Sequence, residues 1–200
     1  MSIAQELTRV VSKWDLLQHP FYQAWSAGTL PTDALKTYAS EYGAFIRLLP
    51  DGWKLLGDAQ TAQEELEHAE LWDRFATALG TKVTTKPHIP QVEMLLRGTT
   101  HLFTDPASAV GALYAFEVQQ PATAESKLNG LKTHYQYPTD AELYFELHRT
   151  NQHEGQKLLE RIEALSDDEQ HLAARSCAEM AEALWDALSG IYMPDPMSHS

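Results

Sequence analysis

Two side chains three residues apart, Glu65 and His68, have types and spacing that suit metal binding. Residues 61–75 around them contain no Gly or Pro and are rich in Ala, Leu and Glu, which predicts a helix. Side chains three apart on a helix lie about one turn apart on the same side, so both can bind one ion. Helical bundles build carboxylate-bridged iron and manganese sites from such Glu-x-x-His pairs. The alternative is a solvent-exposed acidic face with one chance histidine.

Such a site needs ligands from other helices, and the sequence offers Glu117, His148 and His153. Glu117 lies in the apolar run LYAFEV and His148 ends the run LYFELH, where a charge is costly to bury without a partner or a metal. His153 follows His148 by five residues, a rotation of roughly 140° on a helix, so both reach one ion only across a helix bulge or with a second ion between them. Structural alternatives stay open, namely a surface glutamate and a packed core histidine.

Carboxylate and imidazole donors suit iron or manganese better than a structural zinc site. Cys177 is the only cysteine, so the chain has neither a thiolate cage nor an internal disulfide. Open coordination positions beside an apolar cavity would suit the activation of dioxygen. The donor types therefore favour redox chemistry over a purely structural metal site.

Length and charge narrow the class of protein further. Two hundred residues, 44% of them hydrophobic, suit one domain, which we expect over residues 1–192 with a flexible tail at 193–200. The net charge is −13, from 15 basic and 28 acidic residues, so a nucleic-acid partner is not expected. We find neither a signal peptide nor an apolar run of membrane-spanning length, and we expect a cytoplasmic protein.

Apolar spacing, caps and breakers predict about seven helices and no strand, and therefore an all-α bundle. In the helix predicted at 61–79, the apolar residues recur at three- and four-residue steps: Leu66, Ala69, Leu71, Trp72 and Phe75. Pro50 and Pro121 should kink or split their helices, and Gly130 sits where a C-terminal cap is expected. The predicted helices cover residues 2–18, 32–56, 61–79, 91–102, 106–129, 138 through 153, and 166–188.

Several runs of the sequence resemble the heme-oxygenase-like superfamily: HPFYQAWSAGTL, YASEY, EELEHAELWDRFATALG, LYAFEVQQPATAESKLNGLKTHY, YFELH and AEALWDALSGIY. The most specific part is the E-x-Q-x-P pattern at Glu117, Gln119 and Pro121. The resemblance is to the non-heme iron oxidase and oxygenase branch, which includes the CADD-like proteins, and more distantly to the TenA and PqqC families. It covers nearly the whole chain and implies a heme-oxygenase-like bundle.

The resemblance implies that Glu65 (or its neighbour Glu64), His68, Glu117 and His148 bind one or two iron ions, with manganese as the other candidate. It also implies that dioxygen and a small organic substrate react there, as in the CADD-like route to p-aminobenzoate. Three further residues, Tyr38, Tyr42 and Lys127, are candidates for a catalytic role in the pocket. Members of the superfamily commonly form dimers, so a homodimer is expected.

One segment departs from the branch. Its last ligand helix usually continues as His-x-x-x-Asp-x-x-His, but here Gln152 and Gly155 follow His148 at those positions. Either His153 replaces the lost ligand, or the second iron site is weakened, or the site has decayed. Two other functions therefore stay open: a cofactorless enzyme of the TenA or PqqC kind, and a non-catalytic helical binding protein.

Overall fold

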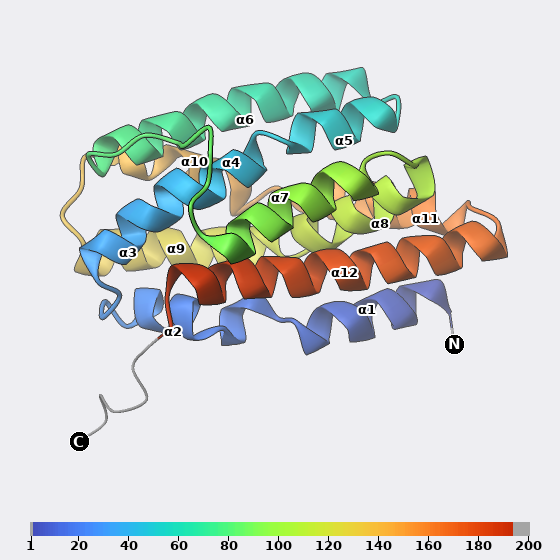
Figure 1. Ribbon diagram of the computed structural model, residues 1–200, viewed down its shortest axis with the longest axis horizontal. Helices are drawn as coiled ribbons and strands as arrows, with labels where there is room; N and C mark the ends of the chain where they lie inside the picture. The colour runs from blue at the N-terminus through green and yellow to red at the C-terminus, as the bar shows by residue number, and fades with distance from the viewer. Residues whose placement is uncertain (1, 194–200) are drawn as a thin grey trace.

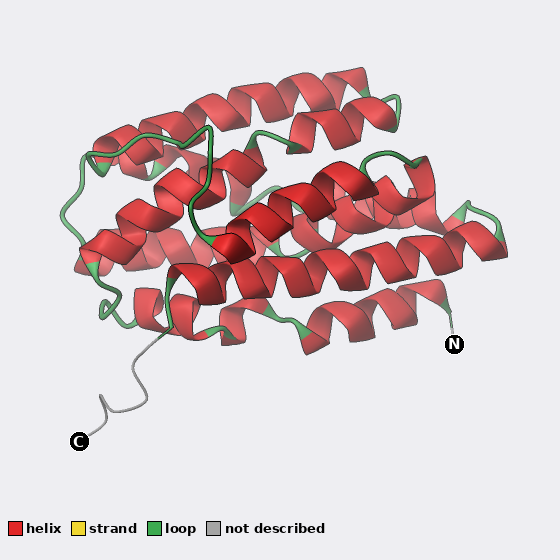
Figure 2. Cartoon of the chain, in the orientation of Figure 1, coloured by secondary structure: helices red, strands yellow, loops and turns green. Residues whose placement is uncertain are grey.

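The computed structural model describes residues 2–193, and every regular element in this range is a helix (Figure 2). The predicted all-α class is therefore confirmed. The tail expected at residues 193–200 lies, apart from its first residue, outside the described part of the chain. Within residues 2–193, no helix is both long enough and apolar enough to span a membrane.

The helices form a bundle in which α8 is the central element (Figure 1). Every residue of α8 from Ala107 to Glu117 is buried, and α12 and α11 pack against it. The helices α1 and α7 cover α12, and α5 packs against α6. Their bounds are α1 Ile3–Lys13, α2 Pro20–Ser26, α3 Thr32–Thr37, α4 Gly43–Ile46, α5 Leu49–Leu55, α6 Ala59–Ala78, α7 Pro90–Leu102, α8 Pro106–Glu117, α9 Gln120–His134, α10 Leu143–His148, α11 His153–Glu163 and α12 Asp167–Ile191.

Polar residues at the helix starts satisfy backbone N–H groups that have no partner inside the helix. The Ser2 hydroxyl accepts from Gln5 N, and the Gln5 side chain accepts from Ser2 N, which completes a capping box before α1. The Asp58 carboxylate accepts from Thr61 N at 3.1 Å and so begins α6. The Asp105 carboxylate does the same for Ser108 N in α8. Local sequence thus sets where the two helices that carry Glu65 and Glu117 begin.

Long predicted helices are divided at their breakers. The 106–129 prediction becomes α8 and α9, with Pro121 in the first turn of α9, where its missing N–H costs nothing. The 32–56 prediction becomes α3, a π-helix at Tyr38–Tyr42, α4 and α5. Such π-helical turns are rare and often occur at functional sites. The π-helix places Tyr38 and Tyr42 one above the other, with ring centroids 4.9 Å apart.

One local prediction was wrong, and one apolar residue lies on an unexpected side of its helix. Gly130 does not cap a helix, because α9 continues to His134; a Cβ at Gly130 would lie 2.5 Å from Trp25 Cδ1, so the glycine makes room for that ring. Leu66 does not face the core and is 51% exposed. The buried side of α6 instead carries Glu65, His68 and Trp72, so polar side chains occupy positions that apolar spacing would assign to the core.

Close packing of α8 against α12 depends on one glycine. A Cβ at Gly111 would lie 2.0 Å from the backbone oxygen of Ala173 in α12. No side chain fits at that distance, so the two helices approach backbone to backbone. This contact holds α8 in the middle of the bundle, with Glu117 in its last turn.

Candidate metal centre

Glu65 and His68 lie side by side on the buried face of α6. The His68 Nδ1 and Glu65 Oε1 atoms are 2.7 Å apart, which is a short hydrogen bond or ion pair. Burial lowers the pKa of His68, but the adjacent Glu65 carboxylate more than offsets this and the net pKa is raised. Burial raises the pKa of Glu65, and His68 opposes that rise. Because the two residues are three apart on α6, this helix alone holds the Glu65–His68 pair together.

His148, the last residue of α10, meets this pair from a second helix. Its ring centroid is 4.5 Å from that of His68. One donor atom each from Glu65, His68 and His148 lies within 4.8 Å of the other two. A carboxylate and two imidazoles in this arrangement match the ligand types of non-heme iron sites.

The protonation of His148 leaves a nitrogen free to bind a metal. Its Nδ1 donates a hydrogen bond to the Tyr144 carbonyl oxygen at 2.7 Å, so Nε2 keeps its lone pair. Burial, followed by the neighbouring His68, lowers the pKa of His148 to about 3. The imidazole is therefore neutral near pH 7, which is the form that ligates a metal.

Glu65 also belongs to a group of three buried carboxylates. One oxygen each from Glu65, Glu117 and Glu154 lies within 4.8 Å of the other two, and all three side chains are buried. Glu117 Oε1 and Glu154 Oε1 have no hydrogen-bond partner within residues 2–193. Burial, followed by the charges of Glu154 and Glu65, raises the pKa of Glu117 well above its ordinary value. Like charges packed this closely require protons or a cation.

Sequence reasoning missed Glu154. The signal was present, because Glu154, Leu158 and Ile162 recur every four residues and form the buried stripe of α11. The predicted helix through His148 and His153 is in fact divided, with α10 ending at His148 and α11 beginning at His153. The rotation expected between the two histidines on one helix therefore does not apply.

His153 itself lies on the exposed side of this junction. One of its donor atoms lies within 4.8 Å of a donor of Glu64 and of Glu154. It thus lies next to Glu154, but it belongs neither to the group of Glu65, His68 and His148 nor to the group of Glu65, Glu117 and Glu154. Its role as a metal ligand stays a prediction, as do those of Glu65, His68, Glu117 and His148.

The predicted catalytic residues gather in a second buried cluster, the lysine–tyrosine cluster, made of Lys127, Tyr22, Tyr38 and Tyr42. Lys127 is 2% exposed, and its Nζ donates to the Tyr38 hydroxyl at 3.2 Å and lies 5.4 Å from the centroid of the Tyr22 ring. Burial lowers the pKa of Lys127 to about 7 and raises those of Tyr38 and Tyr42 well above 10. The charge of Glu117 also raises the pKa of Tyr42, so the two clusters share one interior.

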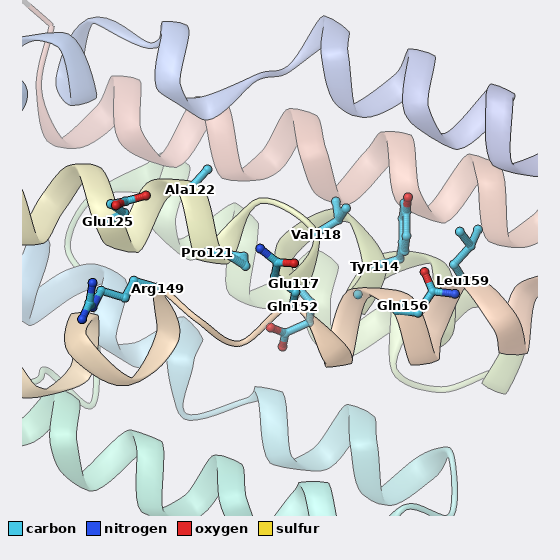
Figure 3. Close-up of a pocket in the computed structure, with 11 residues that line it drawn as sticks. Tyr114, Glu117, Val118, Pro121, Ala122, Glu125, Arg149, Gln152, Gln156 and Leu159 are labelled. Atoms are coloured by element: carbon cyan, nitrogen blue, oxygen red, sulfur yellow. The ribbon is translucent and has the colours of Figure 1, made fainter.

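An open pocket of about 430 Å³ leads to Glu117 between the α8–α9 junction and the start of α11 (Figure 3). Glu117 and Gln152 lie near its middle, Glu125 and Arg149 at one end, and Tyr114 at the other. Of the three buried carboxylates, Glu117 lines this pocket, so a small molecule in it would lie next to Glu117. The pocket has both acidic and basic groups at its mouth, which suits a polar or zwitterionic ligand.

The chain matches known families over nearly its whole length. Residues 53–188 match the model of a family described as iron-containing redox enzymes, and residues 7–51 match that of the TENA/THI-4/PQQC family. It is 30% identical to the 4-aminobenzoate synthase of Nitrosomonas europaea, covering 94% of this chain and 90% of the relative. It is 26% identical to the 4-aminobenzoate synthase of Chlamydia muridarum, covering 100% and 94%.

Solved structures support the fold. A domain of unknown function with a heme oxygenase-like fold from Shewanella denitrificans superposes with a TM-score of 0.79. The superposition covers 96% of this chain and 92% of the other at 15% sequence identity. The expected heme-oxygenase-like bundle is therefore confirmed.

Proposed function

Because this chain belongs to the family of iron-containing redox enzymes, we propose that it is an iron-dependent oxidase or oxygenase that acts with dioxygen on a small organic substrate. The observation that carries the proposal is a pair of buried groups that share Glu65, one with His68 and His148 and the other with Glu117 and Glu154. Their members carry oxygen atoms without partners and a histidine nitrogen with a free lone pair. A divalent metal ion would satisfy these atoms together.

Glu65, His68, Glu117 and His148 would hold the iron, as one ion or as two. Bound iron would supply the electrons that reduce dioxygen. Tyr144 orients one ligand, because its carbonyl accepts from His148 Nδ1 and directs Nε2 toward the site. The hydroxyl of Tyr144 accepts from Gln120 Nε2 at 2.8 Å, which ties the ligand helix α10 to α9.

Lys127 and Tyr38 would handle protons. A lysine whose pKa lies near 7 can both donate and accept a proton at neutral pH, which is the property of a general acid or base. Its Nζ is 3.2 Å from the Tyr38 hydroxyl, so a proton can pass between these two atoms. Tyr42 is stacked on Tyr38 and lies on the side toward Glu117.

The substrate class follows from the relatives. Both are named 4-aminobenzoate synthase, and we propose that this chain also forms 4-aminobenzoate or a related aromatic amine. The pocket of about 430 Å³ beside Glu117, lined by Tyr114 and by the charged Glu125 and Arg149, supports a small polar substrate. A homodimer stays a prediction, which light scattering of the purified protein would test.

The test is metal content followed by turnover. Protein loaded with Fe(II) under anaerobic conditions should hold one or two iron ions per chain and consume dioxygen when air is admitted. Glu117→Ala and His148→Ala should lose the iron while keeping the helical circular dichroism spectrum. Glu125→Ala is the matched control, because this exposed glutamate lines the pocket but lies outside the acid group.

The outcomes separate the three functions considered for this sequence. Wild-type protein that binds no Fe(II) would contradict the proposal. Turnover of a substrate by the iron-free protein would then indicate a cofactorless enzyme, and the absence of any turnover would indicate a binding protein.

A further inference from the structure

A carboxylate that the family resemblance does not assign, Glu154, belongs to the buried acid group. We infer that Glu154 is a metal ligand that takes the place of the aspartate and histidine missing at positions 152 and 155. With Glu65 and Glu117 it would form a second ion position made of oxygen donors, beside the position formed by Glu65, His68 and His148. This inference rests on the proposed function and deepens it.

Glu154 has the geometry of a ligand without its ion. Its side chain is 1% exposed, and its Oε1 atom has no hydrogen-bond partner among the described residues. One of its oxygens lies within 4.8 Å of donor oxygens of Glu65 and Glu117, which come from two other helices. An ionised carboxylate is strongly disfavoured in a buried site unless a positive charge compensates it.

The two positions at which the family places ligands cannot serve here. Gln152 lies in the turn between α10 and α11, exposed in the pocket of Figure 3. A Cβ at Gly155 would lie 3.2 Å from Val118 Cα, which is tighter than ordinary packing, so a histidine there would push α11 away from α8. Because α10 ends at His148 and a new helix, α11, begins at His153, the positions that face the core differ from those of one continuous helix. In α11, position 154 faces the core.

No nearby protein cation is free to neutralise the acid group within the described residues. Lys157, on the next turn of α11, donates to Asp58 Oδ2 at 2.9 Å, and Arg149 Nε donates to Glu146 Oε2 at 2.8 Å. His68 is already bonded to Glu65 and has no hydrogen bond to Glu117 or Glu154. A bound divalent ion supplies the charge that these side chains do not.

Glu65 belongs to both groups of donors and has two oxygens, so one can serve each ion position. The first position then has two imidazole nitrogens, whereas the second has only carboxylate oxygens. Oxygen-only sites suit hard divalent ions, of which Mn(II) is visible by electron paramagnetic resonance. Mn(II) is therefore a useful probe of the second position.

The experiment counts ions in wild-type protein and in E154Q. Anaerobic Fe(II) titration, followed by metal analysis after desalting, should give two ions per chain for the wild type and one for E154Q. In E154Q the second Fe(II) should bind at least about 10-fold more weakly, as should Mn(II) followed by paramagnetic resonance. Glu163→Gln, an exposed glutamate at the end of the same helix, is the matched control and should bind two ions.

Two further variants keep the test decisive. E154D retains the charge but withdraws the oxygens by one methylene, so it should bind the second ion more weakly. It serves if E154Q folds poorly, which circular dichroism would reveal. His153→Ala asks whether the neighbouring histidine supplies the ligand instead.

The inference is overturned if E154Q binds the same number of ions with the same affinity as the wild type. It is also overturned if His153→Ala loses an ion and E154Q does not. In both cases the wild type still holds iron, so the proposed function stands. Wild-type protein that binds no Fe(II) overturns both.

Discussion

Two buried clusters in this bundle carry ionisable groups that, apart from the Glu65–His68 pair, have no ion-pair partner among the described residues. The two clusters can lose their net charge in different ways. The acid group of Glu65, Glu117 and Glu154 has like charges and oxygen atoms without partners. The lysine–tyrosine cluster has one cation, Lys127, whose pKa falls to about 7, so it can lose its charge by releasing a proton. The acid group, in contrast, can be neutralised by taking up a cation.

The stability of the two clusters should therefore respond differently to pH and to the concentration of metal ions. Stability that involves Lys127 should follow pH, because only a proton changes its charge. Stability that involves the acid group should follow pH as well but, unlike that of the lysine–tyrosine cluster, it should also follow the concentration of a divalent metal ion. Substitutions in one cluster should therefore leave the response of the other intact, and the experiments below test that separation.

The largest effect is expected for Lys127→Met. Burial lowers the pKa of Lys127 from 10.5 to about 7 in the folded state. Below pH 7 the buried charged amine therefore destabilises the folded state by roughly 5 kcal/mol. The unfolded chain binds the proton up to pH 10.5 and the folded chain only to about 7, so wild-type stability should rise with pH between these values. Lys127→Met should be more stable at pH 7, without that rise, and inactive.

Urea unfolding at pH 7 and pH 9 measures this change. Lys132→Met is the control, because Lys132 is on the same helix but exposed and paired with Glu146. If Lys127→Met is less stable than the wild type at pH 7, the surroundings stabilise the buried amine. That result would contradict the contrast between the two clusters.

Metal binding should give the next largest effect. At Fe(II) concentrations about 1,000 times Kd, binding stabilises the folded state by about 4 kcal/mol. Glu117→Gln should abolish this gain, because it removes the charge of a carboxylate that is 2% exposed at the centre of the acid group. Thermal unfolding under anaerobic conditions, with and without Fe(II), measures the gain. If Fe(II) stabilises Lys127→Met as much as the wild type, the two clusters are independent. If Fe(II) no longer stabilises Lys127→Met, the two clusters are coupled.

Tyr38→Phe should have a smaller effect. It removes the acceptor of the Lys127 Nζ hydrogen bond and leaves the amine without that partner, which costs about 2 kcal/mol. The double variant with Lys127→Met should recover this loss, because the group left unsatisfied is then absent. Unfolding free energies of the two single variants and the double variant measure the coupling, and additive values would contradict it.

The smallest effect is expected where charges are paired at the surface. Asp58 accepts from Lys157 Nζ at 2.9 Å and from Arg161 Nη2 at 3.1 Å. Burial raises the pKa of Asp58, but its hydrogen bonds to Lys157 and Thr61 outweigh this and the net pKa is lowered. Its stabilisation is present above its unfolded pKa and lost as pH falls through the lower folded value.

Asp58→Asn should therefore cost only about 1 kcal/mol at pH 7, since both cations are partly exposed to solvent. Urea unfolding at pH 7 and pH 3 should show the difference at pH 7 shrinking at pH 3. A loss as large as that expected for the buried groups would contradict the contrast between paired and unpaired charges.

Much of the architecture could be predicted from local patterns. The starts of α1, α6 and α8 follow from Ser2, Asp58 and Asp105, and the division at Pro121 follows from its missing N–H. The pairing of Glu65 with His68 was also predictable, because a helix brings residues three apart together. In each case the determining residues lie within a few positions of one another.

The tertiary structure alone decided which side chains face the acid group. Helix α10 ends at His148, and the following helix α11 packs on α8 with Gly155 against Val118. As a result Glu154 is buried, whereas His153 is exposed. In the same way α6 buries Glu65 and leaves Leu66 in solvent. A helix pattern shows which residues share a face, but the direction of that face depends on contacts between segments distant in the chain, and those contacts are set only when the whole bundle packs.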